Sequence, residues 1–141
     1  MPNVEVKRLP VSNAGQPVAL NHTTLGVTAA GGPALRRLLF ITPYRCTVTA
    51  AKLTAHATIA ANAGDYWSFL LETLDGTDLT SALTTETVLT AGVPRSFTLV
   101  TAGGVNVLAA GTPIYLSMGE TGAPADLDAA YLNVQVLVVP S

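Results

Sequence analysis

Apolar and polar residues alternate one by one over long parts of this chain. Between residues 49 and 59, Ala51 and Leu53 share one side while Lys52 and Thr54 share the other. A period of two places successive side chains on opposite faces of a β-strand, and helical spacing does not fit it. The same alternation is found in four further stretches: residues 66–73, 96–101, 114–119 and 131–139. The pattern predicts an all-β fold, an antiparallel β-sandwich.

Glycine and proline mark turns between these strands at intervals of about ten residues, a spacing typical of a sandwich or barrel. The Asp75-Gly76 pair is a strong turn signal and predicts a hairpin. Residues 79–89 and 124–130 do not show the same clear alternation. Each of these two stretches fits either a short helical turn or an extension of a strand, and the sequence leaves both alternatives open.

The first 36 residues differ from the rest. Val4 and Val6 alternate with charged residues, which suits a strand, but Gly, Pro and Asn then recur in nearly every window up to Pro33. Such a segment forms few hydrogen bonds with itself, so it is either a linker or an arm that lies on another surface. We expect an extended N-terminal arm over residues 1–36 and a β-sandwich domain over residues 37–141.

The composition of the chain indicates a surface that is covered by other molecules. The length of 141 residues suits one domain, and 49% of the residues are hydrophobic, which excludes a disordered chain. Charged residues make up only 11%, against about 25% in average soluble domains. Large apolar patches on a protein surface usually mark interfaces, so we expect oligomerisation or docking onto a larger assembly.

Charge and hydropathy exclude several classes of partner. The net charge is −2 and the basic residues are scattered, which argues against nucleic-acid binding. Residues 9–35 and 96–119 carry no charge and exceed the roughly 18 residues that suggest a spanning helix, but Gly and Pro interrupt both stretches. The N-terminus lacks the apolar block of about 7–15 residues found in a secretory signal. We therefore expect a soluble chain with no membrane partner.

Residue types with catalytic or metal-binding chemistry are few and do not form a motif. His22 and His56 lie far from any metal-ligand pattern, and Cys46 enters a predicted strand as a buried apolar residue. The stretch from Asp75 to Asp78 lacks the further acidic positions of a calcium-binding loop. The sequence thus predicts no enzyme, no metal, no cofactor and no small-molecule substrate.

Aromatic residues suggest two different roles. Trp67 is in phase with Phe69 and Leu71, which predicts a place in the core, although an exposed tryptophan on a sandwich is also able to stack on a sugar ring. Three tyrosines have the opposite register and are expected to face outward, as interface residues often do: Tyr66, Tyr115 and Tyr131.

The part of the chain from Leu38 to Val139 has several segments typical of a known group of proteins. These segments are FITPYRCTV (40–48), AKL (51–53), DYWSF (65–69), AGVP (91–94), LAAGTPIYL (108–116) and TGAPADL (121–127). In them the chain resembles the small jelly-roll decoration proteins, also called cement proteins, on the heads of tailed bacteriophages. Related jelly rolls form the heads of phage fibres and spikes.

The resemblance implies a structural virion protein on the outer surface of a phage capsid. Such a protein is a homotrimer that bridges neighbouring subunits of the major capsid protein and stabilises the shell. An alternative is a trimeric fibre or spike head, or a carbohydrate-binding β-sandwich module. A third hypothesis, an enzyme, has only the unplaced carboxylates in its favour. The residues expected at the partner interface are Val4, Val6, Lys7, Arg8, Leu9, Tyr66, Tyr115 and Tyr131.

Overall fold

A computed structural model describes residues 16–24, 35–127 and 131–141. Nine strands and one short 3-10 helix follow one another along these residues. They are β1 (Val18–Thr24), β2 (Leu35–Ile41), β3 (Cys46–Ala55), β4 (Tyr66–Thr73), β5 (Leu83–Thr84), β6 (Arg95–Ser96), η2 (Ala102–Gly104), β7 (Val107–Leu108), β8 (Pro113–Thr121) and β9 (Leu132–Pro140).

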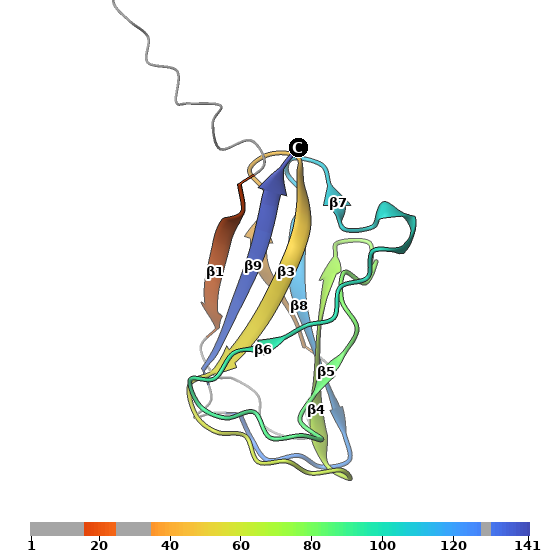
Figure 1. The fold of residues 1–141 in the computed structure, drawn as a ribbon. Helices are drawn as coiled ribbons and strands as arrows, with labels where there is room; N and C mark the ends of the chain where they lie inside the picture. Colours follow the sequence, from red (N-terminus) through yellow and green to blue (C-terminus); the bar gives the residue numbers. More distant parts are fainter. Residues whose placement is uncertain (1–15, 25–34, 128–130) are drawn as a thin grey trace, which may run out of the picture.

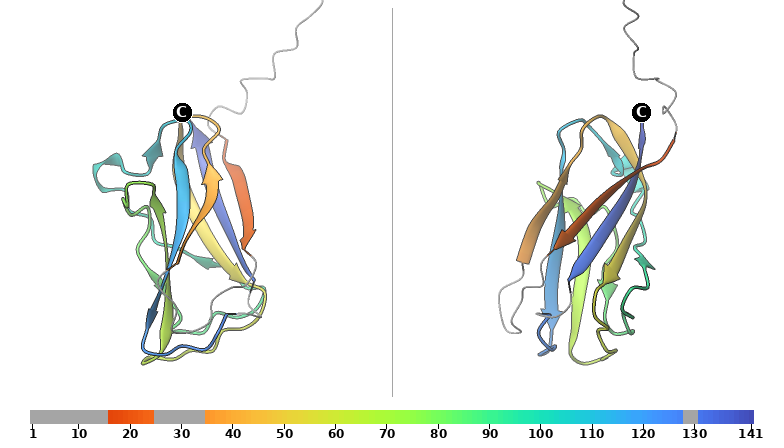
Figure 2. Two further views of the ribbon diagram at one scale, coloured as in Figure 1. Left: turned by 180° about the vertical axis from the view of Figure 1, so that it is seen from behind. Right: turned by 90° about the vertical axis from the view of Figure 1, so that its left-hand side faces the viewer.

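The strands form two sheets that pack face to face (Figures 1 and 2). One sheet has the order β1-β9-β3-β6, with β7 also paired to β3, and the other has the order β2-β8-β4-β5. All pairs are antiparallel, which confirms the predicted antiparallel sandwich. Apart from β7, the strands are distributed between the two sheets in the order of a jelly roll.

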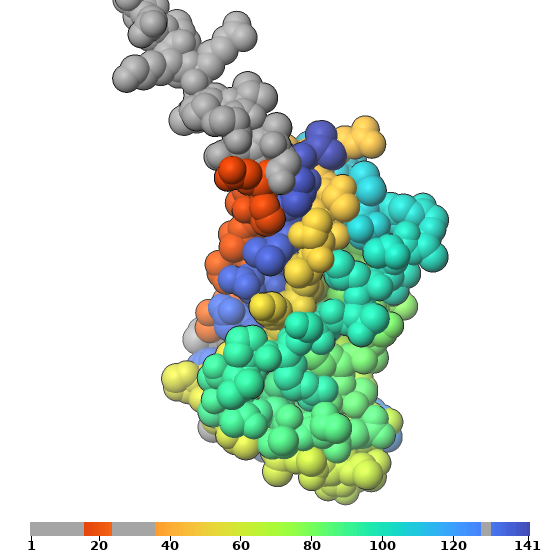
Figure 3. Space-filling model, in the orientation of Figure 1, coloured from red at the N-terminus to blue at the C-terminus, as the bar shows by residue number. Residues whose placement is uncertain are grey.

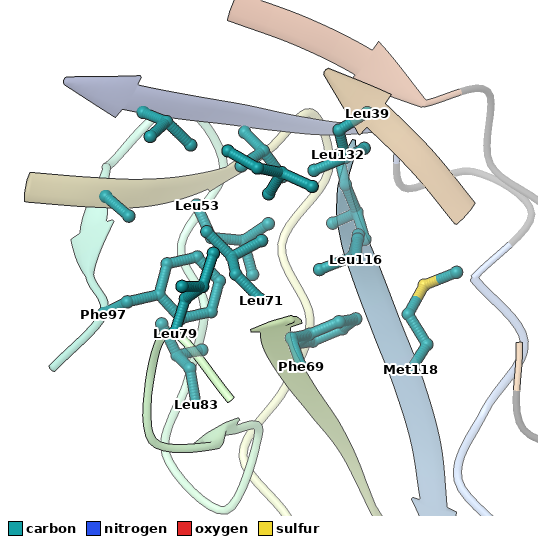
Figure 4. Close-up of a cluster of buried hydrophobic side chains, with 14 of the residues drawn as sticks. Leu39, Leu53, Phe69, Leu71, Leu79, Leu83, Phe97, Leu116, Met118 and Leu132 are labelled. Atoms are coloured by element: carbon teal, nitrogen blue, oxygen red, sulfur yellow. The ribbon is translucent and has the colours of Figure 1, made fainter. Parts of the chain in front are cut away.

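The inward faces of both sheets make one apolar core (Figure 4). Along β3 and β9 the buried positions follow the predicted alternation, and Leu53 and Val134 have no exposed surface. Strands β4 and β8 contribute Phe69 and Leu116 from the opposite sheet, both also fully buried. The register of β3 against β9 shifts between Val48 and Ala50. Because of this irregularity, every second residue faces the core both before and after the shift.

The five-stranded sheet includes residues from the predicted arm. Strand β1 pairs over its whole length with β9, from Val18 opposite Val138 to Thr24 opposite Leu132. The sandwich therefore includes residues that precede position 37, because β9 offers β1 a full set of backbone partners. Residues 1–15 and 25–34 of the predicted arm lie outside the described part of the chain.

One predicted strand is less regular than its pattern suggested, and the two stretches for which a helical turn or a strand extension was left open contain no helix among their described residues. Of residues 96–101, only Ser96 belongs to a strand, although Phe97 is buried and Leu99 forms an isolated bridge with Thr80. Residues 79–89 contain the short strand β5 and no helix. Residues 124–127 are likewise not helical, and residues 128–130 are outside the described chain.

Buried threonines complete the edge of β4 where β5 is too short to do so. The hydroxyl oxygen of Thr85 accepts a hydrogen bond from the Trp67 N–H at 2.9 Å, and that of Thr80 accepts one from the Leu71 N–H at 3.0 Å. A buried N–H group without a partner would cost about 1–3 kcal/mol. The turn predicted at Asp75-Gly76 is confirmed, with Gly76 at φ 84° and its N–H donating to the Thr73 carbonyl.

Candidate functional site

The strands β1, β9 and β3 lie side by side on the outer face of the five-stranded sheet (Figure 3), and the described residues of this face are almost free of charge. The strand register places Asn21, Gln135, Lys52 and Ser96 in one row across β1, β9, β3 and β6. Gln135 donates a side-chain hydrogen bond to the Asn21 amide oxygen at 3.3 Å. The neighbouring rows are built from small or uncharged residues, so Lys52 is the single charged side chain on this face among the described residues. Such a face loses little hydration when another surface covers it.

The outer face of the four-stranded sheet is braced by an arginine. The Arg36 guanidinium lies 4.2 Å from the centre of the Tyr115 ring and donates from Nε to the Glu72 carboxylate at 2.5 Å. Its Nη2 also donates to the carbonyl oxygens of Thr73 and Leu74. Arg36 thereby ties edge strand β2 to β4 across the strand between them, combining a cation–π contact with a charge-assisted hydrogen bond.

We expect Arg36→Lys to lower the free energy of unfolding by about 1 kcal/mol, because lysine lacks the planar fork that reaches Glu72 and both carbonyls. The figure is low because the Arg36 side chain is 35% exposed and its ion pair is partly screened by water. Urea denaturation measures the change. Arg45→Lys, at an exposed arginine outside the strands, is the matched control, and an equal loss in both variants would contradict the role of the brace.

The three tyrosines expected at an interface do not share one patch. Tyr66 and Tyr115 lie on the four-stranded sheet, opposite Thr121 and Glu72 respectively, which separates them by about 20 Å along the strands. Tyr131 directly precedes β9 of the other sheet, is 40% exposed, and contacts the His56 ring at a centroid distance of 5.6 Å. The remaining residues expected at the interface lie outside the described chain: Val4, Val6, Lys7, Arg8 and Leu9. The interface role of all eight residues stays a prediction.

Exposed apolar side chains occur at both ends of the sandwich. Ile41, Leu74 and Val107 lie at the end where β2 and β4 finish and β8 begins, with exposed fractions of 59%, 59% and 41%. We call these three residues the apolar end. Val88 and Val93 are exposed in the loop between β5 and β6. The sequence pattern did not predict the apolar end. Its residues lie near the ends of strands, where alternation no longer shows which side chains face the core and which face outward.

A groove of about 500 Å³ opens at the apolar end, between the turn after β4 and the loop that carries β7. Leu74, Val107 and Pro113 contribute to its lining. Buried Thr42 fixes one wall, since its hydroxyl donates to the Ala109 carbonyl and accepts from the Thr112 N–H, both at 2.8 Å. The groove is a preformed apolar surface rather than a consequence of loose loops.

One carboxylate lies on the rim of this groove. Asp75 accepts hydrogen bonds from the Thr73 hydroxyl and from the Thr77 N–H. These bonds stabilise the ionised form and hold the pKa of Asp75 below its ordinary value. The carboxylate is therefore charged at neutral pH and secures the turn that carries Leu74.

A second cavity, of about 350 Å³, lies between residues 57–65 and 124–127 and has Trp67 in its wall. Trp67 is only 2% exposed, and its indole N–H donates to the Ala125 carbonyl at 2.9 Å. The Asp65 carboxylate accepts from the Ala123 N–H at 2.8 Å. The predicted core position of Trp67 is confirmed, and its ring offers no open face on which a sugar could stack.

No cluster of metal-binding side chains is found among the described residues. They contain no group of three or more His, Cys, Asp or Glu side chains that is able to hold a metal ion. Cys46 is fully buried, as predicted, and burial raises the pKa of its thiol, which disfavours the reactive thiolate. The described part of the chain also has no helix long and apolar enough to cross a bilayer.

Comparisons with known proteins give little further information. No protein-family model matches the chain, and no curated protein matches it in sequence. A solved structure similar to this chain is described as "Structure of infectious bursal disease virus Gx strain", with 12% sequence identity and a TM-score of 0.37. The match covers 89% of this chain and 33% of the viral one, so this chain spans about a third of the length of that protein.

Proposed function

We propose that this chain is a structural virion protein that decorates the outer surface of a phage capsid. The observation that carries the proposal is the apolar end, where Ile41, Leu74 and Val107 are exposed and where Leu74 and Val107 also line a preformed groove. Grouped apolar side chains on a surface usually mark an interface, and the low share of charged residues, 11%, favours the same interpretation. The jelly-roll topology and the sequence resemblance to phage decoration proteins support the same role.

The mechanism is passive bridging. Three copies associate, and the apolar end of each lies on the major capsid protein, so that one homotrimer contacts several neighbouring capsid subunits. A ligand that binds only the assembled shell stabilises it by mass action, and the stabilisation grows with the concentration of free ligand over its dissociation constant. Neither a cofactor nor a small-molecule substrate takes part, and no nucleic acid or membrane is bound.

Capsid binding tests this proposal. Capsids of the virus that carries this chain are expected to resist heating better with the protein than without it, as followed by light scattering or by release of packaged DNA. The double variant Ile41→Ser/Leu74→Ser is expected to bind these capsids at least ten-fold more weakly, because it removes two exposed apolar contacts, each of which contributes about 1 kcal/mol or more.

Val88→Ser is the matched control, because Val88 is similarly exposed but lies away from the apolar end. Equal heat resistance of capsids with and without the protein would contradict the stabilising role. Equal weakening by Val88→Ser and by the double variant would show that the apolar end is not the docking surface. Circular dichroism of all variants separates loss of binding from loss of fold.

The alternative role, a fibre or spike head or a carbohydrate-binding module, has less support. Its strongest cue in the sequence was Trp67, whose indole ring is buried and hydrogen-bonded. Binding of glycans that is lost in Tyr131→Ala, at an exposed tyrosine, would favour this alternative over the capsid role.

A further inference from the structure

Among the described residues, four strands stand at the ends of the two sheets: β1, β6, β2 and β5. Of these only β1 and β2 are longer than two residues, and they differ in how their open edges are protected. Strand β2 ends the four-stranded sheet, carries Arg36 and Arg37, and has a shift of register between Leu38 and Phe40. Charges and bulges of this kind are the usual means by which an edge strand avoids pairing with another chain. The edge at β2 is therefore protected against pairing with another chain, and we call it the guarded edge.

Strand β1 ends the five-stranded sheet and has none of these features. Its seven residues, VALNHTT, include no formally charged side chain at neutral pH with histidine neutral, and no proline, and its register with β9 is unbroken. Within the part of the chain that the structure describes, only β9 pairs with β1. The other edge of β1 thus presents a regular row of backbone N–H and C=O groups, which suits the addition of a further strand.

The inward side chains of β1 indicate what such a strand must supply. Val18 and Leu20 pack against the core but stay partly exposed, because the five-stranded sheet ends beside them. A neighbouring strand with apolar residues at every second position would cover both. On the outer face, Ala19 and Asn21 are uncharged and exposed, so charged neighbours of either sign meet no repulsion there.

The N-terminal segment of the chain has this pattern. In residues 3–9, NVEVKRL, Val4 and Val6 alternate with Glu5 and Lys7. We infer that residues 3–9 of a second copy add as a strand to the open edge of β1, with the valines toward the core and the charged residues outward. This inference rests on the proposed homotrimer, in which three such contacts, each from one copy to the next, close a ring.

A second copy fits better than the same chain. Residues 10–17 separate the segment from β1, and these eight residues exceed the roughly two to five of most hairpin loops. Prolines stand at both ends of this connection, Pro10 and Pro17, and the residue before a proline favours an extended backbone. Fully extended, eight residues span up to about 26 Å, enough to bring the segment to the edge of an adjacent subunit.

Disulfide cross-linking tests the inference. One batch of protein carries Leu20→Cys, and a second, of different length through a purification tag, carries Val4→Cys or Val6→Cys. Directly opposite residues in a sheet have Cβ atoms about 4.5–5.5 Å apart, close enough for a disulfide after a small adjustment. After the batches are unfolded, mixed, refolded and oxidised, we expect a two-chain band containing one copy of each on a non-reducing gel. Unfolding and refolding are carried out under reducing conditions, so that native Cys46 is again fully buried and unreactive when the oxidant is added.

The matched control uses Leu38→Cys, on the guarded edge, in place of Leu20→Cys, and is expected to give less than a tenth of the cross-linked product. Comparable cross-linking at both edges, or no two-chain band with either valine position, would overturn the inference. So would a double variant, Val6→Cys/Leu20→Cys, whose disulfide forms only within one chain.

Sedimentation of the unmodified protein separates this inference from the proposed function. A particle of three times the 14.5 kDa chain mass, without cross-linking at β1, would support the homotrimer and contradict the strand exchange. A single-chain particle at high protein concentration would contradict both the homotrimer and the strand exchange. Deletion of residues 2–9 is expected to shift the sedimenting species from three chains to one while circular dichroism of the sandwich is retained, and an unchanged trimer would contradict the exchange.

Discussion

Phe69→Ala is expected to lower the free energy of unfolding by about 3–5 kcal/mol, the range for removing a large aromatic side chain from a core. The Phe69 ring has no exposed surface and lies in the core between the two sheets (Figure 4). Truncation removes its contacts and leaves a cavity that the flanking strands, fixed by their ladders, are unable to close. Since domains of this size have a total stability of about 5–15 kcal/mol, the effect is large. Urea denaturation followed by Trp67 fluorescence measures it.

The neighbouring residue supplies the control. Leu70 is adjacent on β4 but belongs to the outer face, where it is only half-buried. Leu70→Ala is expected to cost no more than about 1 kcal/mol, because its side chain is already in partial contact with water. Similar losses at both positions would mean that the two faces of β4 do not differ in burial as the structure shows.

Gly122→Ala is expected to destabilise the sandwich by about 3 kcal/mol or more, through backbone strain and overlap together. Gly122 has φ +67°, a region that L-residues avoid, and it closely approaches the 64–65 segment. A Cβ atom added there would lie 2.5 Å from the Gly64 carbonyl oxygen and would overlap the Asp65 carboxylate. The Asp65 carboxylate also binds the Ala123 N–H, so the substitution disturbs the hydrogen bond that holds this loop. Thermal unfolding followed by circular dichroism measures the loss.

Gly111→Ala separates strain from overlap. Gly111 has a similar φ of +80°, but a Cβ atom there would meet nothing within 4 Å. Its substitution is expected to cost only about 1–2 kcal/mol, from the left-handed conformation alone. If Gly122→Ala were no worse than Gly111→Ala, the close approach of Gly122 to the 64–65 segment would have no energetic importance.

The sequence predicted the fold best where strands are long and half-buried. Leu53 and Phe69 were placed on inward faces from their period alone, and both are fully buried. The buried role of Cys46 was also correct. In these strands every second residue faces the core without interruption over most of their length, so the local pattern carries the information.

Other elements depend on contacts that no local pattern records. Strand β1 lies in a Gly- and Pro-rich part of the sequence, and its partner β9 is more than a hundred residues away. The brace from Arg36 to Glu72 also joins residues that are distant in the sequence, though less so, and the apolar end brings together Ile41, Leu74 and Val107 from separate parts of the chain. Periodicity indicates which side of a strand is buried, but it does not indicate which strands meet.

The central place of β9 has a consequence for how this protein is made. Val138 pairs with Val18 on one side and with Val48 on the other, so two strands early in the sequence depend on the last of the described strands. Pairings of such long sequence separation are slow to form, and folds dominated by them typically need milliseconds to seconds. The main sheet is therefore unable to close until β9 has been synthesised. Until the sheet closes, the valine-rich segments of the chain are exposed and prone to aggregate. We therefore expect the yield of soluble protein to depend on chaperone supply and growth temperature.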